Sequence, residues 1–153
     1  MEGVGDMAET TDNLERTVTA ILENFGMVAD FVDEELEKRN VPMAAEAQID
    51  IALDEIYTNV AKYAYGDEVG EVTVRLDFSD DVSEVRMTVS DAGIPYDPLQ
   101  QEDPDVSLEA DERQIGGLGI YLVKQLMDEV SYEYRGGMNI LRIRKILTET
   151  NET

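Results

Sequence analysis

The stretch AAEAQIDIALDEIYTNVAKYAY, residues 44–65, decides how the rest of the chain is organised. Its apolar residues recur three or four positions apart, the period of a helix that buries one face. They are Ile49, Ala52, Leu53, Ile56, Val60 and Ala64. The polar residues Gln48, Glu55, Asn59 and Lys62 follow the edge of that face. The pattern predicts one long helix that ends before Gly66.

Glu55 and Asn59 stand one helical turn apart, so their side chains project to the same side. A carboxylate and an amide beside an apolar face can form a chemical site. The same pair can also be the ordinary polar flank of a surface helix. The segments that follow this helix decide whether the pair is a chemical site or a polar flank.

Length and composition describe one globular domain. The 153 residues are 42% hydrophobic, enough to bury a core, and no apolar run reaches membrane-spanning length. The start, MEGVGDMAETTDN, lacks the apolar centre of a signal peptide, so we expect a cytoplasmic protein without membrane contact.

Two absent residue types narrow the chemistry. The chain has no Cys, which excludes disulfides and thiolate chemistry. It has no His, which excludes a Ser-His-Asp triad, an imidazole zinc site and a phosphohistidine. Any general base must therefore be a carboxylate, a Lys, a Tyr or a terminal amine.

The net charge of −23, from 35 acidic and 12 basic residues, argues against a nucleic-acid partner. A basic protein partner would suit this charge. Solubility in a salty or crowded cytoplasm explains it equally well.

Flanking segments predict the remaining elements. Residues 1–13 have no periodicity and are expected to be a flexible tail, followed by a strand over 14–21. Asn24 is expected to cap a helix that runs to about Arg39, where Val41 and Pro42 end it.

Two hairpins follow the long helix. Residues 71–78 and 85–90 alternate apolar and polar side chains around a turn at 79–81, which predicts an antiparallel sheet covered on one face. Residues 130–135 and 140–147 form a second pair around a turn at 136–139. Five basic residues fall on the outward positions of these strands: Arg75, Arg86, Arg135, Arg142 and Arg144.

Residues 96–114 are polar, acidic and without periodicity, which is typical of a functional lid or of disorder. The run Gly116-Gly117-Leu118-Gly119 then opens a helix over 120–128. Glycines at a helix N-terminus let backbone N–H groups approach a phosphate, although such a run can also be a plain tight turn. It is not a Walker loop, because no Gly-Lys-Ser/Thr follows.

Three further residues have candidate roles. Asp91 stands at a strand end, two residues before Gly93. Its carboxylate can accept a hydrogen bond from an exocyclic amino group, while the glycine leaves room for a flat ring. Alternatively, Asp91 closes an Asx turn. Asn59 is a plausible Mg²⁺ ligand. Glu55 can accept a proton from an attacking hydroxyl or water.

The order of these pieces resembles the GHKL ATPases, the superfamily of gyrase-type subunits, histidine kinases and mismatch-repair ATPases. Within it the chain is most similar to the small bacterial anti-sigma-factor serine/threonine kinases. The resemblance rests on LDEIYTNVAKYAY, VSDAGIPYDP and IGGLGIYLVKQLMDEVSYEYRGGMNILRIRK. It implies a two-layer α/β sandwich over residues 14–148, in which a mixed, mostly antiparallel sheet carries helices on one face. Residues 149–153 are left as a C-terminal tail.

The resemblance also implies residue roles. Glu55 matches the catalytic base, Asn59 the Mg²⁺ ligand, and Asp91 with Gly93 the adenine-binding pair. The run Gly116, Gly117, Leu118 and Gly119 matches the phosphate-binding hinge of an ATP lid, in which Arg113 is a candidate contact of the γ-phosphate. The chain departs from many relatives at residues 62–65, KYAY, where they carry a His.

The implied activity is ATP- and Mg²⁺-dependent phosphorylation of a serine on a STAS-type antagonist, by a homodimer that also binds a sigma factor. Two alternatives remain. A non-catalytic, ATP-gated binding module would keep the same nucleotide residues. The catalytic half of a histidine kinase normally comes with a phosphoacceptor helix and a His, and the sequence offers neither.

Overall fold

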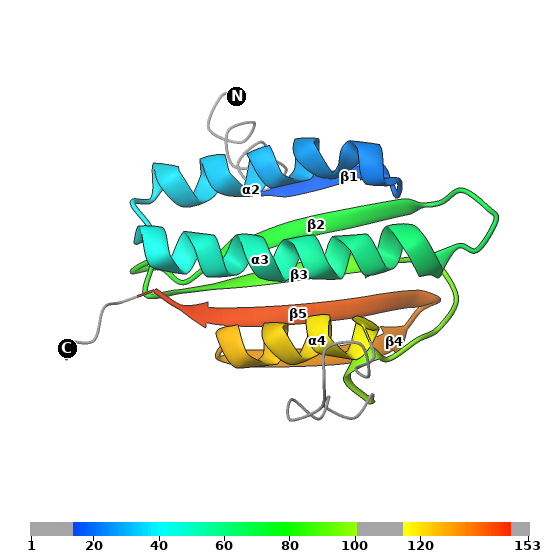
Figure 1. Cartoon of the computed structure of the whole chain (residues 1–153). Coiled ribbons are helices and arrows are strands. Elements are labelled where there is room, and N and C mark those ends of the chain that lie inside the picture. Colours follow the sequence, from blue (N-terminus) through cyan, green and yellow to red (C-terminus); the bar gives the residue numbers. More distant parts are fainter. Residues whose placement is uncertain (1–13, 101–114, 148–153) are drawn as a thin grey trace.

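The computed structural model of the chain describes residues 14–100 and 115–147 (Figure 1). The predicted tails, 1–13 and 149–153, and the predicted lid beyond residue 100 lie outside this range. The strands are β1 (Glu15–Thr19), β2 (Glu71–Phe78), β3 (Glu84–Asp91), β4 (Glu129–Arg135) and β5 (Met138–Ile146). The helices are α2 (Phe25–Lys38), α3 (Met43–Asn59) and α4 (Ile115–Leu126), with short turns η1 (Leu22–Asn24), η2 (Val60–Ala64) and η3 (Pro98–Gln100).

The strands form one sheet in the order β1-β2-β3-β5-β4, and α2, α3 and α4 cover one of its faces (Figure 1). The predicted two-layer α/β sandwich is confirmed. The expectation of a mixed sheet is corrected, because each of the four described strand pairs is antiparallel. Two helices, α2 and α3, connect β1 to β2, so these neighbouring strands run in opposite directions. A single helix, α4, connects β3 to β4, so these two strands run in the same direction, but β5 lies between them in the sheet.

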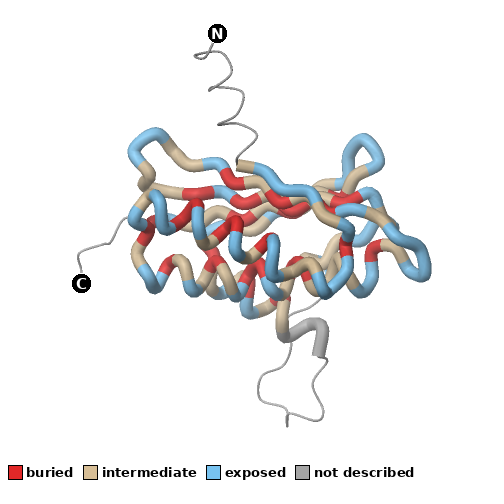
Figure 2. Tube along the Cα trace, turned by 90° about the horizontal axis from the view of Figure 1, so that it is seen from above, coloured by how far each residue is buried: buried red, intermediate tan, exposed pale blue. Residues whose placement is uncertain are grey.

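The core lies between the sheet and the helices, as Figure 2 shows. Helix α3 is central, and its residues Ile49, Leu53 and Tyr57 are fully buried. The Tyr57 hydroxyl donates a 2.7 Å hydrogen bond to the carbonyl of Ile21, so this aromatic side chain fills the core without leaving its polar atom unpaired. The apolar face predicted for residues 44–65 is therefore the face that organises the layer of helices.

The predicted helix over 44–65 is confirmed, and its last turn, η2, widens into a π-helical turn. Helix α2 ends where Asn40 adopts a left-handed φ of 58°. The N–H groups of Asn40 and Val41 then donate to the carbonyls of Glu37 and Leu36, a Schellman motif. Asn24 occupies the N-cap position of α2, as predicted, but its side chain makes no cap hydrogen bond, and Nδ2 donates to the carbonyl of Thr19 instead.

Helix α4 begins at Ile115 and not at Ile120 as predicted. The glycine run therefore lies inside the first turns of the helix, where each glycine costs about 1 kcal/mol of helix stability relative to alanine. Helix propensity alone does not predict a helix over this glycine run, so the start of α4 at Ile115 has to depend on tertiary contacts.

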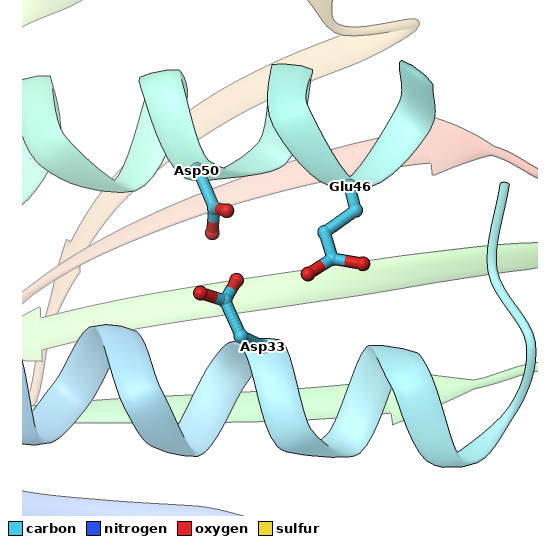
Figure 3. Close-up of side chains that lie close together, drawn as sticks. All are labelled: Asp33, Glu46 and Asp50. Carbon is cyan, nitrogen blue, oxygen red and sulfur yellow. The ribbon is translucent and has the colours of Figure 1, made fainter. Parts of the chain in front are cut away.

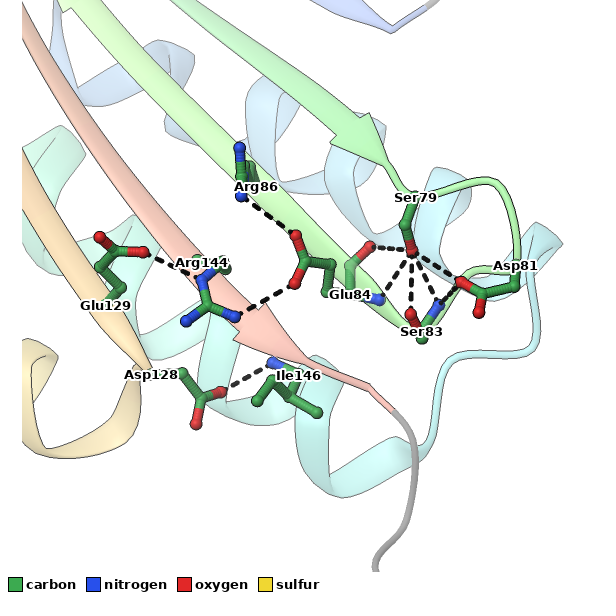
Figure 4. A network of polar contacts seen from close by, with 9 residues as sticks. All are labelled: Ser79, Asp81, Ser83, Glu84, Arg86, Asp128, Glu129, Arg144 and Ile146. Atoms are coloured by element: carbon green, nitrogen blue, oxygen red, sulfur yellow. Dashed lines mark hydrogen bonds and ion pairs between the residues drawn. The ribbon is translucent and has the colours of Figure 1, made fainter.

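The outward face of the sheet carries the five predicted arginines, and each of them has an acidic partner there. Arg144 contacts Glu84 at 3.1 Å and Glu129 at 3.0 Å, and Arg86 contacts Glu84 at 3.3 Å (Figure 4). Arg75, Arg135 and Arg142 likewise pair with acids at 3.1–3.4 Å. Within the described part of the chain, these ion pairs neutralise the five arginines of this face.

The predicted turn between β2 and β3 is closed by Ser79, whose Oγ accepts the N–H groups of Ser83 at 2.9 Å and Glu84 at 3.0 Å (Figure 4). This fixes the register of the two central strands, because loop geometry determines which residues face each other in a hairpin.

Among the described helices, none is long and apolar enough to cross a membrane.

Candidate functional site

The structure brings Glu55 and Asn59 together near the end of α3. Asn59 Nδ2 donates a 3.3 Å hydrogen bond to Glu55 Oε2. A carboxylate only accepts hydrogen bonds, so the amide nitrogen of Asn59 faces Glu55. The amide oxygen, Asn59 Oδ1, takes no part in this contact. The pair thus offers one proton acceptor and one neutral oxygen ligand from adjacent turns.

Gly119 of α4 packs directly against Glu55. A Cβ added at residue 119 would lie 2.1 Å from the Cδ and Oε2 atoms of Glu55. Only a glycine at this position leaves room for the carboxylate. Gly119 is the fifth residue of α4, so its N–H can bond to a carbonyl within the helix and is not one of the leading N–H groups left open to a phosphate. Gly119 therefore has a structural reason to be glycine that is independent of phosphate binding.

Burial raises the pKa of Glu55, whereas the hydrogen bond from Asn59 acts in the opposite direction. The nearby Asp54 also raises it, and Lys62 lowers it. A raised pKa makes the carboxylate a better proton acceptor than one in water, which suits general base catalysis near neutral pH.

Beside this pair lies a pocket of about 460 Å³ between α3, η2 and the sheet. Its walls are mainly apolar, from Ile56, Val60, Ala64, Val89, Ile120 and Leu141. Six side chains with a polar atom line it: Asn59, Tyr63, Asp91, Tyr96, Tyr132 and Asn139. An apolar cavity with a few converging polar groups is the usual form of a small-molecule site.

Asp91 ends β3 and is only 5% exposed. Its Oδ1 accepts the N–H of Gly93 at 2.8 Å, so the Asx turn considered as the alternative is present. Oδ1 also accepts from Asn139 Nδ2 at 2.9 Å. Within residues 14–100 and 115–147, no donor is found for the second oxygen, Oδ2. Asp91, a residue that lines the pocket, therefore makes its turn with one oxygen.

Gly93 is required by the backbone of η2. A Cβ at this residue would lie 2.2 Å from the carbonyl oxygen of Ala64, and the neighbouring Ile94 N–H donates to the same oxygen at 2.8 Å. The contact brings the segment after Asp91 against the end of the long helix. Space for a flat ring stays the predicted role of Gly93.

Two residues of this site were missed by the sequence interpretation. The sequence pattern predicts Asn139 in a hairpin turn, but it is the second residue of β5 and is paired with Asp91 across the sheet. The pattern gives Tyr65 no role beyond the end of the helix, but its hydroxyl donates to the carbonyl of Glu71 at 2.6 Å and accepts the N–H of Ala92 at 2.8 Å. Only the register of β3 against β5 could have identified Asn139.

The remaining predicted residues are less fully described. Arg113 lies outside the described residues. Gly116, Gly117 and Leu118 lie in the first turn of α4, whose leading N–H groups have no partner within a helix. Their predicted role in phosphate binding stays a prediction.

A second cluster of polar groups lies between α2 and α3, where Asp33 faces Glu46 and Asp50 (Figure 3). Burial, together with the neighbouring carboxylates, raises the pKa of Glu46 to about 7 and that of Asp50 to about 8. One oxygen each of Asp33 and Asp50 is buried, without a hydrogen-bond partner among the described residues. This cluster shares no residue with the lining of the apolar pocket.

The model of the histidine kinase-like ATPase domain matches residues 18–145. The chain belongs to the histidine kinase-like ATPase family.

Within that family its relatives include RsbW-type serine-protein kinases. The chain is 40% identical over 101 residues to "Serine-protein kinase RsbW" of Listeria monocytogenes, which covers 63% of this chain and 63% of the relative. It is 31% identical over 140 residues to the protein of the same name from Bacillus velezensis, covering 88% of this chain and 86% of the relative. The aligned part thus spans less than two thirds of the Listeria relative.

Solved structures confirm the fold. The RsbU and RsbW domains of a Mycobacterium tuberculosis protein superpose with a TM-score of 0.60 at 16% identity, covering 89% of this chain and 33% of the other. A histidine kinase domain from Erythrobacter litoralis gives 0.53 at 22% identity, covering 80% and 59%.

Proposed function

We propose that this chain is an ATP-dependent protein serine kinase and anti-sigma-type regulator, acting in the cytoplasm on a STAS-type antagonist. The observation that carries the proposal is the arrangement of three side chains around one pocket. Asp91 lines the pocket and uses only Oδ1 in its bonds to the described residues, and Asn59 lines the same pocket in contact with Glu55. Both the family and the RsbW-type relatives support an ATP-using phosphotransferase.

The pocket suits an adenine ring. Its volume and apolar walls fit a flat heterocycle, and the open oxygen of Asp91 accepts a hydrogen bond from an exocyclic amino group. A ring with a carbonyl at that position would place two acceptors against each other. We assign Asp91 to selection of adenine and Gly93 to the close approach that shapes the pocket.

The donor set also fits Mg²⁺. Asn59 Oδ1 is a neutral oxygen, and Mg²⁺ is commonly held by one or two protein oxygens while water and phosphate complete its shell. Bound there, the ion neutralises charge on the phosphates. We propose Asn59 as its protein ligand, with phosphate contacts from the first turn of α4 at Gly116 and Gly117, and from Arg113.

Glu55 is the proposed general base. Its carboxylate takes the proton of the attacking seryl hydroxyl, the seryl oxygen bonds to the γ-phosphorus, and the bond between that phosphorus and the bridging oxygen breaks to release ADP. Such a transfer needs positioning and charge neutralisation more than covalent catalysis. The elevated pKa of Glu55 lets it hold the proton during the transfer.

The proposed partners are a STAS-type antagonist that provides the serine and a sigma factor that the chain sequesters, with the chain acting as a homodimer. The test is affinity capture from cells with the tagged chain loaded with either ATP or ADP, followed by mass spectrometry of partners and phosphosites. We expect nucleotide-dependent exchange of two partners, and a phosphoserine on one of them. Capture of the same proteins with both nucleotides, none of them phosphorylated, would contradict the proposal.

A further inference from the structure

Asn139 is the most completely bonded polar side chain next to the pocket. It is only 7% exposed and lies opposite Asp91, where β5 pairs with the end of β3. Its Nδ2 donates to Asp91 Oδ1 at 2.9 Å and to the carbonyl of Ile94 at 3.0 Å. Its Oδ1 accepts the N–H of Tyr96 at 3.1 Å and the hydroxyl of Tyr132.

This bonding pattern requires an amide. The carboxylate of Asp91 and the carbonyl of Ile94 only accept, while the Tyr96 N–H only donates. An amide side chain offers two donor hydrogens and two acceptor lone pairs, and all four are used here. Aspartate would lack the donors, and an apolar residue would leave several buried polar groups unpaired.

The contact with Asn139 determines how Asp91 faces the pocket. Together with the N–H of Gly93, it occupies Oδ1 and fixes the plane of the carboxylate. The oxygen left over is Oδ2, on a residue that lines the pocket. A carboxylate held in this way presents a single acceptor in one direction, whereas a freely rotating one could turn or hydrate.

We propose that Asn139 is a positioning residue that sets the specificity of this site for a purine carrying an amino group at its 6-position. It acts through Asp91, and it also holds Ile94 and Tyr96, which continue the pocket wall. The inference rests on the proposed assignment of Asp91 to adenine.

The test is a comparison of two probes that differ at this edge of the purine. ATP has a 6-amino group and an N1 acceptor, whereas inosine triphosphate has a 6-carbonyl and an N1–H. The change in the ratio of their dissociation constants from the wild type to Asp91→Asn therefore reports the contact with Asp91. A merely structural role would weaken both nucleotides equally. Calorimetric titrations are made on the wild type, Asn139→Ala and Asp91→Asn, with thermal unfolding of each.

We expect the wild type to prefer ATP, and Asn139→Ala to reduce that preference about tenfold by weakening ATP while leaving inosine triphosphate nearly unchanged. A folded Asn139→Ala protein with the wild-type ratio would overturn the role of Asn139. If Asp91→Asn lost the preference for ATP in the same experiment, the assignment of Asp91 to adenine would still stand. An unchanged ratio in Asp91→Asn would instead remove the assignment itself.

Tyr132→Phe provides a milder variant if Asn139→Ala does not fold. It deletes only the hydroxyl that holds Asn139 Oδ1, and it keeps the ring in place. We expect the preference for ATP to fall about threefold. A ratio equal to that of the wild type would then count against Asn139 as a positioning residue.

Discussion

Replacing Gly119 by alanine should disable the proposed base without unfolding the protein. The new Cβ would lie 2.1 Å from the Glu55 carboxylate, whereas ordinary contacts of a Cβ begin near 3.4 Å. The carboxylate must therefore move by more than 1 Å, and as the end of a flexible side chain it can do so. Misplacing a catalytic group by about 1 Å costs roughly a hundredfold in rate.

The stability of the same variant should change little. Alanine gains about 1 kcal/mol of helix propensity over glycine, which offsets part of the about 1–3 kcal/mol that overpacking costs. We expect the melting temperature to stay within about 5 °C of the wild type and ATP affinity within about threefold. Phosphoryl transfer to the partner serine should fall roughly a hundredfold.

Gly26→Ala is the matched control, because Gly26 also lies in a helix and its Cβ would meet no atom within 4 Å. It should be neutral or slightly stabilising and fully active. The assays are radiolabelled phosphate transfer, an ATP titration and thermal unfolding. Wild-type transfer rates in Gly119→Ala would refute the reasoning, since the base would then tolerate a displacement of over 1 Å.

Three further predictions concern the nucleotide and pH. Asp91→Asn should weaken ATP binding about tenfold, as calorimetry can measure, because the pocket loses a hydrogen-bond acceptor. As the pH is lowered, phosphate transfer should be lost at a pH above the ordinary pKa of a glutamate, because burial raises the pKa of Glu55 and only its ionised form accepts a proton. If the rate of Glu55→Gln fell with acidification at the same pH, this prediction would be contradicted. Stability should fall as pH rises from about 4 to about 8, because the folded protein keeps protons on Glu46 and Asp50 that the unfolded chain releases. Asp50→Asn should flatten that fall in thermal scans, by about a few degrees at pH 8; an equally steep fall would argue against proton retention there.

Much of the fold follows from local patterns. The face built on Ile49 and Leu53 predicts the long helix, and the alternation of Val72, Val74 and Leu76 predicts a strand with one buried side. These patterns need only local sequence, since a helix or strand repeats its burial every few residues. The early start of α4 could not be predicted, because its glycines disfavour a helix and the packing of Gly119 on Glu55 is tertiary.

The site was predictable where its residues share one element. Glu55 and Asn59 are four residues apart on α3, so their contact is a matter of helix geometry. Asn139 and Asp91 are 48 residues apart and meet only through the register of β3 against β5. The carboxylate cluster of Asp33, Glu46 and Asp50 depends in the same way on how α2 packs against α3.

The central claim, that Glu55 is the base of a serine kinase, is tested most directly by one paired measurement. Transfer of radiolabelled γ-phosphate to the copurified antagonist is compared in the wild type and Glu55→Gln, beside ATP titrations of both proteins. We predict transfer by the wild type, a fall of roughly two to four orders of magnitude in the variant, and nearly equal ATP affinity. A variant that transfers phosphate at the wild-type rate would contradict the claim, and so would a wild-type protein that binds ATP and its partner without any transfer.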